Sequence, residues 1–158
     1  VTDRYFYESF DDRAELFAAA FERVVGELLE VVGDAARRAT GPPEAQARAA
    51  VEAFVRALTD DPGRARLLFV EVGAVGGDIA RQVRASTRRF AELVAAVARP
   101  HLAPGIPPHR LTMAALSLIG AMGIVVLEWL GGDLDATVDD ITDYFVDLLL
   151  AAGAAAPR

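Results

Sequence analysis

The chain has 158 residues, of which 53% are hydrophobic, so it is long and apolar enough to fold as one domain with a substantial core, and it is not a disordered chain. The absence of cysteine excludes disulfides, thiolate metal sites and cysteine nucleophiles. The formal net charge of -7 makes the chain, as given, a poor candidate for binding nucleic acid by itself, because such binding usually needs a basic face.

Apolar residues recur at helical spacing along almost the whole chain, and the alternation typical of strands is absent, so the sequence predicts an all-α fold. A short helical fragment is expected over residues 2–7. Proline and glycine clusters then separate about six main helices, expected at residues 11–33, 43–58, 63–72, 78–99, 110–130 and 136–152. The apolar stripe of the first of these helices is predicted to be Phe17, Phe21, Val24, Leu28 and Val31.

The helix predicted at 110–130 contains LTMAALSLIGAMGIVVLEWL, which is long enough to span a bilayer. Its neighbours are amphipathic with charged outer faces, as in water-soluble bundles, so no membrane span is expected. A helix buried on more than one side, partly by a second subunit, explains the sequence better, because small residues let another helix approach closely. The predicted dimer interface of the last two helices comprises Ala115, Gly120, Ala121, Val125, Trp129, Ile141, Phe145 and Leu148.

The opening stretch VTDRYFYESFDDRAELF resembles the end of the DNA-binding domain in the TetR/AcrR family of transcriptional regulators. In that family a recognition helix ends in a Tyr-x-x-Phe pattern, which Tyr7 and Phe10 match. Arg13 stands where the family usually has lysine, and Glu15-Leu16 matches the pair that opens the next helix, whereas Glu8 departs from the family's pattern. The family's layout of six further helices, with a four-helix dimer interface from the last two, also fits the predicted elements.

The resemblance implies that residues 1–10 are the remnant of a helix-turn-helix DNA-binding domain, and that residues 11–158 are a ligand-binding and dimerisation domain. Because a helix-turn-helix needs two further helices to hold its recognition helix, we expect the chain to be truncated or partly ordered, with operator DNA bound through the missing N-terminal part. The DNA-contacting residues implied in this chain are Thr2, Tyr5, Tyr7 and Arg13.

Polar residues within apolar helix faces suggest a ligand cavity, since such pockets are mostly apolar with a few fixed polar groups. Each of these polar residues could equally bond to a helix carbonyl or to an arginine. Aromatic and methionine side chains would supply the apolar wall. The predicted ligand-binding residues are Phe54, Phe69, Glu71, Thr87, Phe90, Met113, Ser117 and Met122.

No convergent acid, base and nucleophile, phosphate loop or metal-ligand spacing is visible, so neither catalysis nor a metal or cofactor is expected. The sequence, with its family resemblance, predicts a cytoplasmic, homodimeric, ligand-responsive DNA-binding regulator. We expect a repressor, in which a small, largely apolar effector bound in the helical core releases DNA. A ligand-independent dimeric helical adaptor is the alternative, and an α-helical enzyme is a weaker third interpretation.

Overall fold

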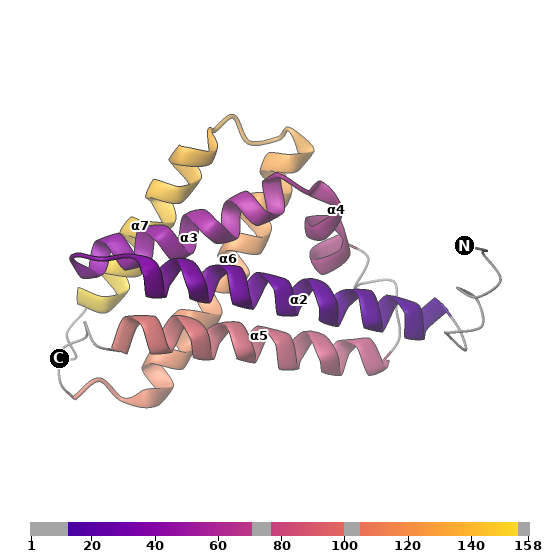
Figure 1. Cartoon of the computed structure of the whole chain (residues 1–158), viewed down its shortest axis with the longest axis horizontal. Helices are drawn as coiled ribbons and strands as arrows, with labels where there is room; N and C mark the ends of the chain where they lie inside the picture. The colour runs from indigo at the N-terminus through magenta and orange to yellow at the C-terminus, as the bar shows by residue number, and fades with distance from the viewer. Residues whose placement is uncertain (1–12, 71–76, 100–104, 155–158) are drawn as a thin grey trace.

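The computed structural model of the chain describes residues 13–70, 77–99 and 105–154 (Figure 1). Over these ranges the chain forms α-helices and one π-helical segment, and contains no strand. The elements are α2 (Arg13–Arg38), α3 (Pro43–Thr59), α4 (Pro62–Ala65), η1 (Arg66–Val70), α5 (Gly77–Ala98), α6 (Pro108–Gly131) and α7 (Val138–Ala154). The all-α prediction and the order of the six main helices are confirmed, whereas the fragment predicted over 2–7 lies outside the described residues.

The helices pack around α2 and α3, which lie against each other. In Figure 1, α5 runs beside α2 on one side, and α7 packs against α3 on the other. The helix α6 contacts both α5 and α7, so it closes the bundle behind them. The core therefore lies between these two layers, and its largest fully buried side chains are Phe145, Leu28, Leu58, Val25, Val55, Val126 and Val146.

Two of the predicted elements differ from the structure. The first main helix continues past Gly33 to Arg38, where Arg37 and Arg38 both pair with Asp34 and suit the negative end of the helix dipole. The segment expected as one α-helix over 63–72 begins as the short α4 and then widens into the π-helix η1. Because π turns are rare and often occur at functional sites, η1 makes this region a candidate functional site.

The turn between α6 and α7 is fixed at both ends by hydrogen bonds. Gly132 has a φ of 83° and closes α6 in a Schellman arrangement, in which the N–H of Asp133 donates to the carbonyl of Glu128 at 3.0 Å. The indole N–H of Trp129 donates to the carbonyl of Ala136 at 2.6 Å. These bonds hold the last two helices at a set angle to each other.

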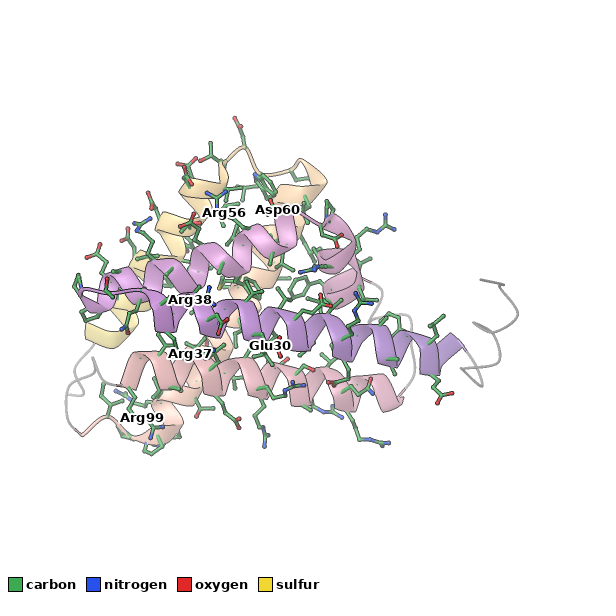
Figure 2. The ribbon with its side chains drawn as sticks, viewed as in Figure 1. Glu30, Arg37, Arg38, Arg56, Asp60 and Arg99 are labelled. Atoms are coloured by element: carbon green, nitrogen blue, oxygen red, sulfur yellow. The ribbon has the colours of Figure 1, made fainter. Side chains whose placement is uncertain are left out.

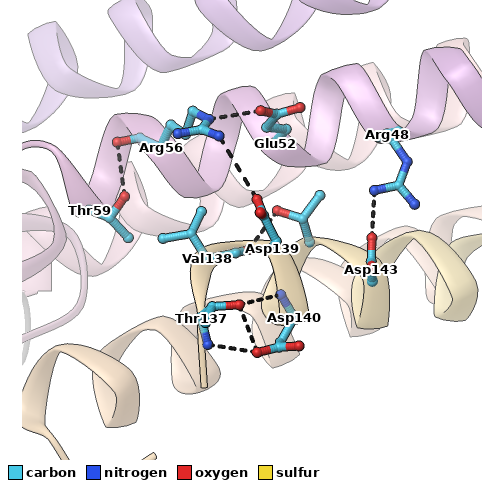
Figure 3. A network of polar contacts seen from close by, with 10 residues as sticks. Arg48, Glu52, Arg56, Thr59, Thr137, Val138, Asp139, Asp140 and Asp143 are labelled. Atoms are coloured by element: carbon cyan, nitrogen blue, oxygen red, sulfur yellow. Dashed lines mark hydrogen bonds and ion pairs between the residues drawn. The ribbon is translucent and has the colours of Figure 1, made fainter. Parts of the chain in front are cut away.

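Charged side chains lie on the outer faces of α2, α3 and α7. Glu30, Arg37 and Arg38 are exposed on α2 (Figure 2). Between α3 and α7, Arg48 pairs with Asp143 at 2.5 Å and Arg56 lies 3.9 Å from Asp139 (Figure 3). Exposed pairs of this kind contribute at most about 1 kcal/mol each, so they orient the two helices more than they stabilise them.

A reciprocal cap begins α7, and it links stability to pH. The hydroxyl of Thr137 accepts from the N–H of Asp140 at 3.1 Å, while the Asp140 carboxylate accepts from the hydroxyl and N–H of Thr137 at 2.7 and 2.8 Å (Figure 3). The hydroxyl bond, followed by the backbone bond, lowers the pKa of Asp140 from its ordinary value of 3.8. A lowered carboxyl pKa contributes stability that is present above the unfolded value and is lost as the pH falls.

We therefore predict that the free energy of unfolding of Asp140→Asn decreases less steeply than that of the wild type as the pH falls below about 4, because the pH-sensitive cap bond is gone. Thr137→Ala should lower the free energy of unfolding by about 1 kcal/mol at neutral pH, as the loss of a helix cap does. Urea unfolding between pH 3 and 7 checks both, with Asp147→Asn on the exposed face of α7 as control. If the free energy of unfolding decreases equally with falling pH in Asp140→Asn and in the wild type, Asp140 does not form this cap.

Candidate functional site

A cavity of about 280 Å³ lies between α2, α3, η1, α5 and α6, and it is open to the surface where α6 contributes the exposed Leu116, Gly120 and Ile124. Its wall is formed mainly by aromatic and aliphatic side chains from these five elements. The lining residues are Phe21, Val25, Phe54, Leu68, Phe69, Val83, Ser86, Thr87, Phe90, Leu116, Ile119, Gly120, Gly123, Ile124 and Leu127. Because the wall combines helices distant in sequence, only the folded bundle creates this site.

A second, smaller cavity of about 50 Å³ adjoins the first and is entirely apolar. Both cavities are lined by Phe54, Phe90 and Ile119, so these three side chains form the boundary between them. The rings of Phe54 and Phe90 meet edge to face, with centroids 5.8 Å apart and planes at 84°. The interior therefore offers one apolar space that an aromatic pair divides into two compartments.

Two adjacent side chains of α5 are the polar side chains among the described residues that line the larger cavity. The hydroxyl of Thr87 donates to the carbonyl of Val83, one turn earlier, at 2.8 Å. Ser86 is 3% exposed, and its hydroxyl oxygen has no hydrogen-bonding partner within the described part of the chain. The hydroxyl of Thr87 is thus bonded to the helix, whereas the hydroxyl of Ser86 is buried without a hydrogen-bonding partner in the described part of the chain.

Close packing of η1 on α6 shapes one end of the larger cavity. A Cβ atom at Gly123 would lie only 2.7 Å from Cε1 of Phe69, so the ring occupies the space that any other residue at this position would fill. Ion pairs hold the neighbouring elements: Arg64 of α4 lies 3.0 Å from Glu27 of α2, and Arg89 of α5 lies 2.9 Å from Glu22. These ion pairs link α4 and α5 to α2 at the side of the cavity formed by η1.

The structure places the predicted ligand residues in different environments. Four of them line the larger cavity, namely Phe54, Phe69, Thr87 and Phe90, and Met122 lines the smaller one. Ser117 is exposed and Met113 is 63% exposed, and neither lines a cavity, so the expectation that Ser117 is buried in the cavity wall is wrong. The reason is rotation about α6, since Leu116 and Gly120 face the cavity and Ser117 lies about 100° away. Glu71 lies outside the described residues.

The predicted dimer residues also divide into two groups. Ala115, Ile141 and Phe145 are 2%, 3% and 0% exposed because they pack in the chain's own core, so their placement at a surface for a second subunit is wrong. Gly120 is exposed, Leu148 is 38% exposed, and three others are partly buried: Ala121, Val125 and Trp129. The last two helices nevertheless present large exposed hydrophobic side chains, namely Met113, Leu116, Ile124, Tyr144 and Leu148.

The predicted DNA contacts cannot be placed. Thr2, Tyr5 and Tyr7 lie outside the described residues, and Arg13 is the first residue of α2, with its side chain also outside them.

Sequence reasoning missed several cavity residues, of which Ser86 and Gly123 are the most informative. Ser86 lies three residues after Val83 and four before Phe90, and this spacing places it on the apolar stripe of α5. That signal was available in the sequence. The contact of Gly123 with Phe69 depends on how η1 docks, which no local pattern encodes.

A helical bundle with an apolar cavity that carries a few polar groups has the form typical of small-molecule binding sites. The family model described as Tetracyclin repressor-like, C-terminal domain, matches residues 40–152. The chain therefore belongs to the TetR family of transcriptional regulators and contains the C-terminal domain of that family.

Two known proteins are similar to the chain. The HTH-type transcriptional activator FasR of Mycolicibacterium smegmatis is 29% identical over 134 residues, which cover 84% of this chain and 59% of that protein. The chain thus spans less than two thirds of the length of this relative. The crystal structure of the transcriptional regulator FadR from Bacillus subtilis in complex with stearoyl-CoA matches with a TM-score of 0.75 at 12% identity, over 99% of this chain and 83% of that one. At this identity the match shows a shared fold.

The contact between Gly123 and Phe69 predicts a large cost for the smallest possible substitution. Gly123→Ala should lower the free energy of unfolding by about 1–3 kcal/mol, because the new methyl group must displace the ring of Phe69. Gly26→Ala is the matched control, since a Cβ there meets nothing within 4 Å and alanine is favoured within a helix by about 0.5–1 kcal/mol. Urea unfolding of both variants checks this, and equal stability of the two would contradict it.

Proposed function

We propose that this chain is the ligand-binding and dimerisation part of a ligand-responsive transcriptional regulator, and that its effector is a largely apolar molecule bound in the 280 Å³ cavity. The observation that carries the proposal is the cavity itself, lined by aromatic and aliphatic side chains of five helical elements. A space of this kind supports a sensor over the ligand-independent adaptor, whose core needs no such opening. The two similar proteins are named as regulators and not as enzymes.

A long-chain acyl compound is the effector class that we favour. The cavity is near the lower end of the roughly 300–1,000 Å³ typical of ligand pockets. A flexible chain that passed between Phe54 and Phe90 would also reach the smaller apolar compartment. The neighbouring FadR structure contains stearoyl-CoA, a molecule with such a chain.

We propose that residues 1–10 are the end of a recognition helix and that residues 11–158 form the sensor domain. Effector binding would then favour a bundle arrangement with altered affinity for operator DNA, a coupling that requires each arrangement to bind the two ligands differently. A regulator of this kind acts in the cytoplasm.

The direction of regulation has two candidates. Release of DNA on effector binding, as in a repressor, is the direction that the family resemblance favours. The relative FasR is named as an activator, which favours the opposite outcome at the target promoter. A reporter gene placed under the regulator's own promoter, with and without the regulator, separates the two.

Exposed apolar surface supports a homodimer built by α6 and α7. The helix α6 is long and apolar enough to cross a membrane by length and composition alone, with a mean hydropathy of 2.0, yet only 28% of its most apolar stretch is buried within the chain. A second copy packed on this face would cover the remainder, and the adjacent Tyr144 and Leu148 of α7 would extend the contact.

The cavity assignment predicts that filling the cavity weakens effector binding. Val83→Phe, in the wall between Ser86 and Phe69, should weaken the binding of stearoyl-CoA at least tenfold, because the larger ring occupies the space for the acyl chain. The control is Val31→Phe, at a position that is 45% exposed on α2 and lines neither cavity. Calorimetric titration measures the affinities, and undiminished binding by Val83→Phe would place the effector elsewhere.

The dimer assignment predicts that a charge on the exposed face separates the subunits. Leu148→Arg should raise the dissociation constant of the dimer at least tenfold, because an unpaired charge buried in an apolar interface is strongly unfavourable. Val31→Arg, on the opposite layer of the bundle, should leave the dimer intact. Sedimentation velocity over a concentration series distinguishes these outcomes, and an intact Leu148→Arg dimer would remove α7 from the interface.

A further inference from the structure

The hydroxyl of Ser86 is a buried polar group without a partner, in the wall of an otherwise apolar cavity. Serines within helices commonly bond to the carbonyl one turn earlier, as the adjacent Thr87 does with Val83. Ser86 makes no such bond, although it is 3% exposed. Burying a hydroxyl in this state is unfavourable, so a group that completes its hydrogen bonding inside the cavity gains affinity.

A second unsatisfied oxygen lies one turn away on the same helix. Oε1 of Gln82 is also buried without a partner within the described residues, and positions four apart on a helix lie on the same side. The amide oxygen of Gln82 can only accept, whereas the hydroxyl of Ser86 can donate or accept. Gln82 lines neither cavity, so the match to a ligand rests on the hydroxyl of Ser86, which can pair with a group that donates or accepts, such as a hydroxyl or an amide.

Among the described lining residues, the other polar side chain can accept a hydrogen bond from a ligand but has no free proton to donate. Thr87 is the other polar side chain among the described lining residues, and its hydroxyl proton is already engaged by the carbonyl of Val83. Among the described lining residues, the position of Ser86 is therefore the one at which a side chain can both donate to and accept from a polar group on a bound ligand. That place is on α5, next to the ring of Phe90 that separates the two compartments.

We infer that Ser86 is a specificity-determining residue, which selects an otherwise apolar effector that carries a hydroxyl or amide group by hydrogen bonding to that group. This inference rests on the proposed function, because it names the chemistry of the effector that the cavity accepts. Ser86 would distinguish between largely apolar molecules of equal size by whether they carry a hydroxyl or amide group. The apolar wall alone cannot make this distinction.

The test compares two probes of similar length, heptan-1-ol and 1-chloroheptane, on the wild-type chain and on Ser86→Ala. The change from wild type to variant should weaken heptan-1-ol about fivefold more than 1-chloroheptane, as expected for one neutral hydrogen bond. The fold-change for heptan-1-ol is divided by the fold-change for 1-chloroheptane. This comparison cancels the different free-energy costs of removing the two probes from water. Affinities are measured by NMR titration, and heptanamide in place of heptan-1-ol tests the amide.

Thr87→Val is the matched control, because it removes a hydroxyl from the same wall that is already bonded to the helix. It should change the ratio of the two affinities less than Ser86→Ala does, because the proton of the Thr87 hydroxyl is already bonded to the helix. A second readout is independent of ligand: deleting an unpaired hydroxyl should leave the melting temperature of Ser86→Ala unchanged or raised. A fall of several degrees would show that the hydroxyl has a partner within the protein and would overturn the inference.

The two proposals fail in different ways. If the wild-type chain binds both probes and Ser86→Ala weakens both equally, the selectivity assigned to Ser86 is wrong while the apolar cavity stands. If the wild-type chain binds neither probe, the proposed apolar effector site is wrong and the role of Ser86 falls with it.

Discussion

The interior depends on the edge-to-face contact between Phe54 of α3 and Phe90 of α5. These rings are 7% and 8% exposed, so they belong to the buried core, and they also form the wall shared by both cavities. A contact of this geometry contributes about 0.5–1.5 kcal/mol beyond the burial of the two rings. The same pair thus joins two helices that are distant in sequence and decides whether the apolar space is one compartment or two.

The helix α6 shows how one element meets three different surroundings. Its stripe of Ala115, Leu118, Met122 and Val126 is buried in the core of the chain. A neighbouring stripe with Gly120 and Gly123 borders the larger cavity, and Phe69 of η1 occupies the space that glycine leaves. The remaining face carries exposed residues such as Met113 and Ser117. Core, cavity and outer surface are therefore separated by rotations about a single axis.

That arrangement explains how much could be predicted from the sequence. Helix order and approximate bounds followed from apolar spacing and from proline and glycine breaks, since these signals are local. On α5, charged residues mark the outer face, so Thr87 and Phe90 were placed on the correct stripe. On α6 almost every residue is apolar, so no polar marker indicates which stripe faces inward. Ser117 was consequently assigned to the cavity, although it lies on the exposed face.

Adjacent apolar residues caused a similar error on α2. Both Val24 and Val25 could belong to the stripe, as could Val31 and Val32, and the sequence does not decide between members of each pair. In the structure Val25 and Val32 are buried, and Val31 is 45% exposed. The burial of Ile141 and Phe145 within the chain depends on how tightly α3 packs on α7, which is a tertiary contact. The π-helical form of η1 also has no local signature in RLLFV.

The turn between α6 and α7 has a mechanical consequence. A left-handed glycine, an indole bond to Ala136 and the reciprocal cap at Thr137 fix its backbone from one helix to the next. Such a turn resists a change in the angle between α6 and α7, because the indole bond that spans it would have to break. The turn therefore couples the position of α7 to that of α6.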